Sequence, residues 1–382
     1  MLPNVIIVGA GILGTSIAYH LSKLGEKHVV VVDRRGLSAG ATGRSGALVR
    51  ANFDNRADAR RALMSVEFFR NWGDRVGGRC GFSAVGHMEI ADASSCRPLG
   101  ELIKRQRRWG VDIGLIDAAE AKARVPWLRL EPADRLIAYH GSAGCCDPNV
   151  ANRALYDAAR GRGVEFIFGE TVLSVLVAAG RAVGVKTSRR VLGAQAIVLA
   201  TGAWSNQLLK PLRLDFGLVT RLSRLVVFGT DEIDGRETFP TILDHVQQAW
   251  FRPMPEGCIL VGAERGGRDN VHPTKVADTV PPPLVASYRR VLARRFAVSA
   301  HAAARASWAG TYMMSPDRRP IVGNVRQIPG LFLTVGDSGT SFKIAPAIGL
   351  GLAELIIHRA CRSVDLTDLA PDRFETAVAG AA

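Results

Sequence analysis

The sequence predicts an α/β fold in which a Rossmann-like domain is joined to a second α+β domain built on an antiparallel sheet. Three observations support this prediction: a glycine-rich turn between an apolar strand and a helix near the N-terminus, a second apolar strand ending in an acid, and mixed strand-like and helical runs in the middle of the chain. With 382 residues, 47% of them hydrophobic, the chain is long enough for two domains.

The first predicted unit is residues 4–33. The run "NVIIVGAG" has the continuous apolar character of a strand buried on both faces, "ILGTSIAYHLSKLG" follows as a helix, and "HVVVVD" is a second buried strand. Gly9, Gly11 and Gly14 form a G-x-G-x-x-G motif in the strand-turn-helix context that a dinucleotide site needs. They allow a tight turn, a close approach to pyrophosphate and close helix packing, while Asp33 can accept a ribose hydroxyl.

The next segment, "RRGLSAGATGRSGALVR", shows no strand or helix period up to Ala47. An extended dinucleotide such as FAD needs a second set of close backbone contacts, and this glycine- and serine-rich segment is placed to supply them. The motif alone does not separate FAD from NAD, so an NAD-dependent dehydrogenase stays an alternative.

The domain organisation is predicted to be discontinuous. Residues 1–80, 147–215 and 308–382 form the FAD-binding domain, and residues 81–146 and 216–307 form the substrate domain, where runs such as "RLSRLVVFG" and "CILVGAE" indicate an antiparallel sheet. Near the C-terminus we predict a strand, a turn with Gly336, Ser338 and Gly339, and a helix at about 344–357. The N-terminus of this helix is the second one that can face a flavin.

Composition excludes several classes of protein. The formal net charge is +14, but the basic clusters at 104–109 and 288–296 are short and lack interleaved stacking aromatics, so we expect no nucleic-acid binding but attraction of small acidic substrates. The six cysteines show no metal-ligand spacing and no disulfide pattern. The N-terminus lacks the basic region of a signal peptide and its apolar run is too short for a membrane span. We therefore expect a cytoplasmic protein without a metal site.

Four stretches together resemble the D-amino-acid-oxidase-type flavoprotein family, which includes glycine oxidase and the sarcosine oxidases. They are the glycine motif with Asp33 and "AGATGRSGALVR", then "VLGAQAIVLATGAWSNQLL" (191–209), "WAGTYMMSPDRRPIVG" (308–323) and "LFLTVGDSGTSFKIAPAIGLGLAELI" (331–356). Their order and spacing extend the resemblance over nearly the whole chain. The resemblance implies an FAD site made of Gly9, Gly11, Ile12, Leu13, Gly14, Asp33, Arg34, Thr42, Gly43, Arg44, Ser45, Gly46, Ala47, Val172, Thr201, Gly202, Trp204, Gly310, Gly336, Ser338, Gly339, Thr340, Ser341, Phe342 and Lys343.

The resemblance to the sarcosine-oxidase branch also implies a clamp for the substrate carboxylate. Its arginine corresponds to Arg50 and its lysine to Lys343, which stands in the apolar run "SFKIAP". An arginine fork and a lysine point charge suit a carboxylate. The alternatives are a phosphate or surface contact for Arg50 and a side chain that reaches the surface for Lys343.

Further positions follow from the same resemblance. Tyr312 stands where glycine oxidases carry a substrate-binding arginine, and Trp250 and Arg252 correspond to a substrate-lining strand, although Trp250 could equally be core. Gly310 replaces a flavin-linking cysteine, which implies noncovalent FAD. Leu260 replaces an oxygen-activating lysine, so the sequence does not decide whether the protein is an oxidase or a dehydrogenase. No histidine is assigned as a base, because the spacing supports none of His87, His245 and His301.

The expected function is FAD-dependent hydride removal from the C–N bond of an amino acid or N-alkyl amino acid, such as sarcosine, proline, an opine or a D-amino acid, to give an imine that hydrolyses. The substrate is thus a small amine that bears a carboxylate, and a partner subunit or another acceptor can take the electrons. The alternatives are a 2-hydroxy acid oxidoreductase and an electron-relaying subunit of a larger amine dehydrogenase complex.

Overall fold

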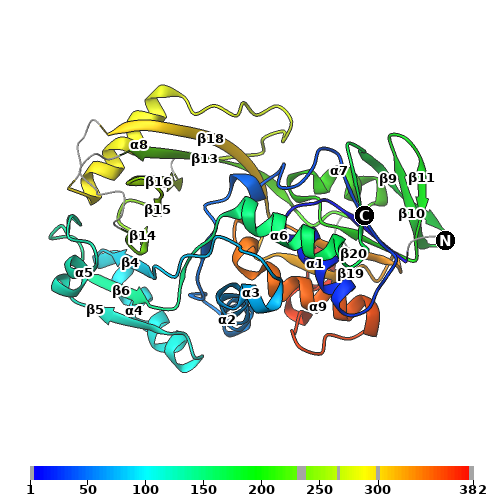
Figure 1. Ribbon diagram of the computed structural model, residues 1–382, viewed down its shortest axis with the longest axis horizontal. Coiled ribbons are helices and arrows are strands. Elements are labelled where there is room, and N and C mark those ends of the chain that lie inside the picture. Colours follow the sequence, from blue (N-terminus) through cyan, green and yellow to red (C-terminus); the bar gives the residue numbers. More distant parts are fainter. Residues whose placement is uncertain (1–3, 230–237, 265–266, 298–301, 378–382) are drawn as a thin grey trace.

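The computed structural model describes residues 4–229, 238–264, 267–297 and 302–377. Two bodies of sheet and helix lie side by side, and the long strands β13 (Val219–Gly229) and β18 (Ala303–Met314) extend from one toward the other (Figure 1). This mixed α/β architecture confirms the predicted fold class.

The first body is organised around a six-stranded sheet. Its strand order is β19-β20-β12-β1-β2-β8, in which β19 alone pairs antiparallel with its neighbour. The strands are β1 (Val5–Val8), β2 (Val29–Asp33), β8 (Glu165–Phe168), β12 (Ala196–Leu199), β19 (Ile321–Asn324) and β20 (Leu331–Val335).

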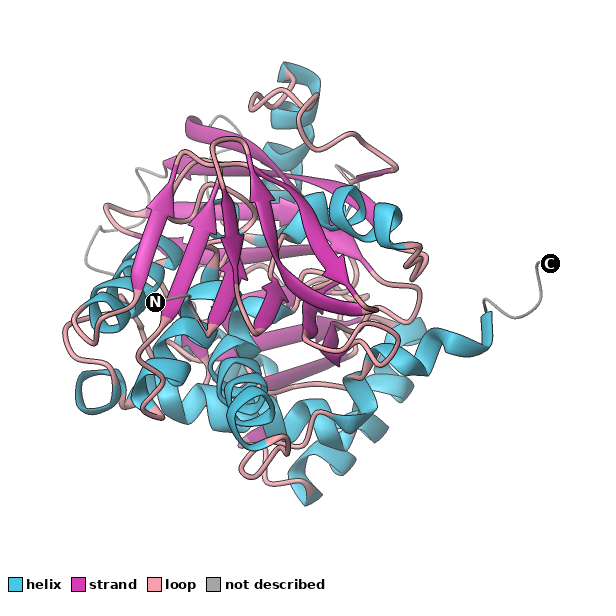
Figure 2. Cartoon of the chain, turned by 90° about the vertical axis from the view of Figure 1, so that its right-hand side faces the viewer, coloured by secondary structure: helices cyan, strands magenta, loops and turns pink. Residues whose placement is uncertain are grey.

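Both faces of this sheet are covered, which explains why β1 is apolar at every position. Val5 and Ile7 pack with the helices on one face, whereas Ile6 and Val8 pack with a three-stranded antiparallel sheet on the other. Figure 2 shows the strands gathered above the helices. The elements concerned are α1 (Ile12–Lys23), α2 (Arg56–Arg70), α3 (Trp72–Arg75), α6 (Pro148–Arg160), α9 (Ala345–His358), β9 (Val172–Ala178), β10 (Arg181–Thr187) and β11 (Val191–Gly193).

The second body contains a nine-stranded sheet that is antiparallel except where β14 pairs with β4. Its order is β17-β13-β16-β15-β14-β4-β6-β5, and β18 also pairs with β13. The further elements are β4 (His87–Ala91), β5 (Ile113–Ile116), β6 (Leu136–His140), β14 (Thr241–Asp244), β15 (Ala249–Met254), β16 (Cys258–Ala263), β17 (Arg268–Asp269), α4 (Ala93–Arg108), α5 (Ala118–Arg124) and α8 (Pro282–Arg295).

Strand β18 crosses the domain boundary that we predicted at residue 308. It pairs with β13 from Ala303 opposite Gly229 to Met314 opposite Val219, so residues 308–314 belong to the second sheet by their hydrogen bonds.

Short elements complete the described chain and shape the loops around the site. They are β3 (Leu48–Val49) paired with β7 (Gly144–Cys145), α7 (Ser205–Leu209), and the 3₁₀ turns η1 (Thr42–Arg44), η2 (Gly202–Trp204), η3 (Lys210–Leu212), η5 (Ser341–Ile344), η6 (Thr367–Leu369) and η7 (Pro371–Ala377). Within the described ranges, the segment Ser341–His358 is long and apolar enough for a membrane span, but 67% of it is buried inside the protein, which makes it weak evidence for one.

Candidate active site

The turn between β1 and α1 is built from glycines that leave no room for a side chain. Gly9 has a φ of +112°, and a Cβ there would lie 2.3 Å from the carbonyl oxygen of Ala200. A Cβ on Gly14 would lie 1.9 Å from the carbonyl oxygen of Gly9. The chain therefore turns sharply after β1, and α1 packs tightly against the strand, as the motif predicts.

The N-terminus of α1 is arranged to receive an anion. Gly11 makes no side-chain cap, and the first turn carries no acidic residue. Thr42, from the loop after β2, accepts a hydrogen bond from the amide of Ile12 at 3.0 Å. The positive end of the helix dipole thus lies between two loops that contain small residues, which suits a pyrophosphate.

Asp33 is fixed at the end of β2 by backbone amides. Its Oδ2 accepts a hydrogen bond from Ala10 at 2.9 Å, and its Oδ1 accepts hydrogen bonds from Arg35 and Gly36 at 2.8 and 3.0 Å. These bonds orient the carboxylate, and each oxygen retains acceptor capacity for a ribose hydroxyl, the role that we predicted.

A cavity of about 330 Å³ extends from this turn to the second sheet. It brings together predicted cofactor residues that are up to about 300 positions apart in the chain. Those that line it are Gly9, Gly11, Ile12, Leu13, Asp33, Arg34, Thr42, Arg44, Ser45, Gly46, Val172, Thr201, Gly202, Trp204, Gly310, Gly336, Gly339, Ser341 and Phe342.

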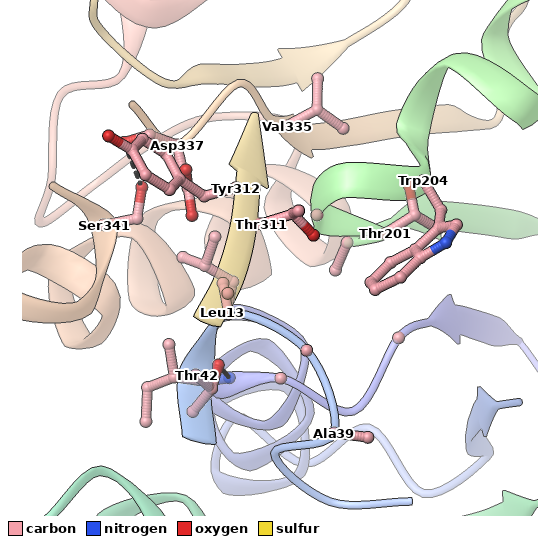
Figure 3. A pocket seen from close by; sticks show the side chains of 18 of the residues that line it. Leu13, Ala39, Thr42, Thr201, Trp204, Thr311, Tyr312, Val335, Asp337 and Ser341 are labelled. Atoms are coloured by element: carbon pink, nitrogen blue, oxygen red, sulfur yellow. Dashed lines mark hydrogen bonds between the residues drawn. The ribbon is translucent and has the colours of Figure 1, made fainter. Parts of the chain in front are cut away.

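The cavity carries different groups on its two sides. Figure 3 shows Trp204 and Thr201 on one side and Tyr312, Asp337 and Ser341 on the other. The guanidinium carbon of Arg34 lies 3.8 Å from the Trp204 ring centroid, so that the pair forms a flat wall. Flat groups at the sides and a phosphate-binding turn fit FAD, in which two ring systems are joined through a pyrophosphate.

Trp250 lines the cavity from β15 and is held between two glycines. A Cβ on Gly262 would lie 2.3 Å from the indole, and a Cβ on Gly46 would lie 2.4 Å from it. The indole is therefore fixed in the wall of the cavity. It packs against both glycines and also lines the cavity.

Lys343 is buried beside the cavity and does not reach the surface. Its side chain is 7% exposed, and Nζ lies 5.5 Å from the centroid of the Phe53 ring and 3.5 Å from the carbonyl oxygen of Thr340. Burial and the positive charge of Arg50 lower the pKa of Lys343 to about 7, against the opposing effect of Asp337. A buried cation of this kind lacks a full counter-charge in the protein.

Arg50 follows β3, the strand that packs on η5, where Lys343 lies. Its Nη1 donates a hydrogen bond to the carbonyl oxygen of Asn52 at 2.9 Å. Burial lowers the pKa of Arg50, and the charge of Glu89 opposes this effect. Arg50 and Lys343 are thus close enough for their charges to interact, although they are almost 300 residues apart in the sequence.

A polar face of the second sheet is turned toward these cations. His87 and Glu89 of β4 alternate with the core residues Met88 and Ile90, and His140 lies opposite His87 in β6. Burial and the charge of Arg50 lower the pKa of His87 well below its usual value.

The hydrogen bonds of this polar face keep its histidines in place. Thr241 Oγ1 lies 2.8 Å from Nδ1 of His87, and Glu89 Oε2 lies 2.7 Å from Nε2 of His245. Neither His87 nor His245 lines the cavity, while His301 lies outside the described residues.

Some predicted residues are not among those that line the cavity. Arg252, which we expected to line the substrate site, donates a hydrogen bond from Nη1 to the carbonyl oxygen of Gly46 at 2.9 Å and so supports that loop. Gly43 packs on the carbonyl oxygen of Ser38. The predicted residues outside the lining set are Gly14, Gly43, Ala47, Arg50, Arg252, Ser338, Thr340 and Lys343.

Sequence reasoning missed Asp337, which lines the cavity next to Tyr312 (Figure 3). The available signal was an acid that follows a buried strand after a single glycine, at the carboxyl edge of the sheet where ligands bind. Other lining residues, which we did not predict individually, include Ala39, Gly40, Ala41, Glu170, Thr171, Gln207, Leu208, Ser223, Leu225, Thr311 and Thr334.

The fold and the site together define a dinucleotide-binding oxidoreductase with a second domain that covers the far side of the cofactor cavity. The family described as "DAO: FAD dependent oxidoreductase" matches residues 4–355. The chain belongs to this family and is an FAD-dependent oxidoreductase, which confirms the resemblance and the cofactor that we expected.

Several known proteins are similar to this chain over most of its length, which supports this assignment. The uncharacterized oxidoreductase YurR of Bacillus subtilis is 28% identical over 93% of this chain and 95% of its own length. Human mitochondrial sarcosine dehydrogenase is 24% identical over 93% of this chain, which spans only 40% of that longer protein. The crystal structure of L-proline dehydrogenase from P. horikoshii superposes with a TM-score of 0.90 at 25% identity, covering 98% of each chain.

Proposed function

We propose that this protein oxidises the C–N bond of an amino acid or N-alkyl amino acid. Bound FAD would supply the hydride acceptor for the carbon next to nitrogen, and the imine product would hydrolyse in water. The residues of the chain hold the substrate by its carboxylate, orient its reacting carbon and keep bulk water away from it.

The observation that carries this proposal is the pair of interacting cations, Arg50 and Lys343, beside a cavity that fits FAD. Two like charges in a buried place repel each other, and the arrangement is relieved when an anion binds between them. A carboxylate suits an arginine fork and a lysine ammonium better than a neutral group does. The names of the relatives, sarcosine dehydrogenase and L-proline dehydrogenase, agree with a carboxylate-bearing secondary amine.

FAD is proposed to be bound noncovalently. None of the cavity-lining residues is a cysteine, and Gly310 occupies the position of the linking cysteine of the monomeric sarcosine oxidases. A Cβ there would already lie 2.9 Å from Cβ of Arg44. The six cysteines are all unpaired, which agrees with the cytoplasmic location that we propose.

The electron acceptor is a separate question. Leu260, at the position of an oxygen-activating lysine, is 1% exposed and packs with Leu225 and Val227. Leucine at this position of β16 carries no positive charge that could activate oxygen. This favours a dehydrogenase, or an electron-relaying subunit with a partner, over an oxidase.

An anaerobic absorbance screen tests the proposal. Sarcosine, proline, opines, D-amino acids and 2-hydroxy acids are added one at a time to the purified yellow protein. We expect bleaching of the flavin by at least one amino or N-alkyl amino acid. Bleaching by 2-hydroxy acids alone would select the alternative reaction, and a flavin that no substrate bleaches would contradict an enzymatic role for the isolated chain.

A further inference from the structure

We propose that Asp337 receives the amino group of the substrate, accepts its ammonium proton and thereby selects amino acids over hydroxy acids. This inference rests on the proposed function and adds a second, oppositely charged recognition point to its carboxylate clamp.

The position of Asp337 is set by the turn after β20. Its Oδ1 accepts a hydrogen bond from the amide of Gly339 at 3.2 Å, which fixes the carboxylate over the turn. Figure 3 shows the side chain next to Tyr312 and Ser341 on one side of the cavity. Asp337 thus lines the cofactor cavity itself, and Lys343 is close enough to interact with its charge.

The charges around Asp337 match an α-amino acid. Such a substrate carries its nitrogen and its carboxylate on the same carbon, so the groups that bind them must be neighbours. Asp337 and Lys343 both lie in the segment between β20 and α9 and their charges interact, and Arg50 also interacts with Lys343. An ammonium near Asp337 therefore leaves the carboxylate near the cations.

The charged and titratable groups near Asp337 lie on several elements. Tyr312 of β18 faces it, and burial raises the pKa of this phenol, which therefore stays neutral. Arg221 of β13 lies opposite Tyr312 in the sheet and forms an ion pair with Asp269 at 3.2 Å. Lys343 is the charged group that acts on Asp337 directly, Arg50 acts on Lys343, and the carboxylates of Glu264 and Asp269 act on Tyr312.

Burial raises the pKa of Asp337 to about 6, although the Gly339 amide and the charge of Lys343 act in the opposite direction. At neutral pH the group is thus ionised and is a stronger base than an exposed aspartate, as general base catalysis requires. In the step that we propose, the N–H bond of the bound ammonium breaks, the proton goes to the Asp337 carboxylate, and the electron pair stays on nitrogen. The neutral amine is then the form that can lose hydride.

Matched ligand pairs test this role. L-proline is compared with tetrahydrofuran-2-carboxylate, and sarcosine with methoxyacetate; in each pair oxygen replaces the N–H group. With Asp337→Asn, which keeps an acceptor for the Gly339 amide, we expect kcat/KM for the amines to fall by roughly a hundredfold or more. Binding of the ether carboxylates, followed by the change in flavin absorbance, should stay within about threefold or become tighter.

The pH profile gives a second measurement. In the wild type, kcat/KM should fall as the pH decreases through about 6, because the acceptor is then protonated. This acid limb should disappear in Asp337→Asn and return in Asp337→Glu. Asp215→Asn is the matched control, since exposed Asp215 caps Gly217 at 3.0 Å in the same local arrangement, away from the cavity.

The outcomes separate this inference from the proposed function. Equal losses for amines and ether carboxylates in Asp337→Asn would mean that Asp337 only balances the charge of Lys343, which overturns the inference and leaves the amine oxidation standing. An unchanged acid limb would overturn it as well. If no amino acid reduces the wild-type flavin, the proposed function fails first and this inference falls with it.

Discussion

Lys343 shows how one residue can decide between a structural and a functional interpretation. A lysine between Phe342 and Ile344 is expected to extend to water if it has no partner, yet its ammonium is buried. A cation kept in this place at the cost of desolvation indicates that an anion completes the site.

Lys343→Met tests this interpretation because methionine keeps the apolar stem and removes the charge. We expect kcat/KM for a carboxylate substrate to fall at least about 100-fold, equivalent to about 2.7 kcal/mol, while FAD stays bound. Lys186→Met, on an exposed position of β10, is the control. Unchanged kinetics in Lys343→Met would remove this lysine from the clamp.

The pH dependence of the clamp follows from the same residue. The pKa of Lys343 in the free protein is about 7, so its charge is present below that pH and is lost as the pH rises through it. kcat/KM for a carboxylate substrate, which reports the free enzyme, should therefore decline on the alkaline side of about pH 7. Lys343→Met should lack this decline, and an identical alkaline limb in both proteins would contradict the assignment.

At the scale of elements, the β1-turn-α1 unit depends on the contact between Gly14 and the carbonyl oxygen of Gly9. Gly14→Ala places a Cβ where only 1.9 Å is available, so α1 must move away from β1 and carry its first amides away from the pyrophosphate. We expect loss of FAD on gel filtration and a lower melting temperature. Gly36→Ala, with nothing within 4 Å of the added Cβ, should retain the cofactor; equal retention in both variants would contradict the packing argument.

Local elements with strong periodicity could be predicted from the sequence. The strands β1 and β2 and the helices α1 and α9 were predicted within a few residues, because apolar runs and glycine turns are local signals. The parallel pairing of β14 with β4 was not predictable, since it joins residues more than 150 positions apart. The polar face around His87 depends on that pairing, and the sequence contains no local signal for it.

The residues of the candidate site also fall into those that the sequence could predict and those that it could not. Backbone roles such as those of Gly9 and Gly11 follow from a local motif, whereas the role of a side chain depends on what the fold places opposite it. Arg252 was expected to line the substrate site, but β15 directs its guanidinium to the carbonyl oxygen of Gly46. Asp337 was passed over because the importance of its carboxyl group appears only once Tyr312 and Lys343 are placed around it.

At the scale of the whole molecule, the cavity depends on both sheets. Gly9 and Asp33 come from the first sheet, whereas Trp250 and Tyr312 come from β15 and β18 of the second. The described chain joins the two bodies through long strands that run between them (Figure 1). A ligand that fills the cavity contacts both bodies and therefore resists their separation.

This arrangement predicts that FAD stabilises the entire chain rather than one domain. A ligand that binds only the folded state adds about 2.7 kcal/mol at a free concentration 100 times its Kd, so protein stripped of FAD should melt at a lower temperature and regain the difference when FAD is added. The transition should remain a single one, because both bodies lose their shared ligand together. NAD⁺ at the same concentration is the control, and it should leave the melting temperature unchanged. An equal shift with NAD⁺, or flavin that stays attached after acid denaturation, would contradict selective noncovalent FAD binding.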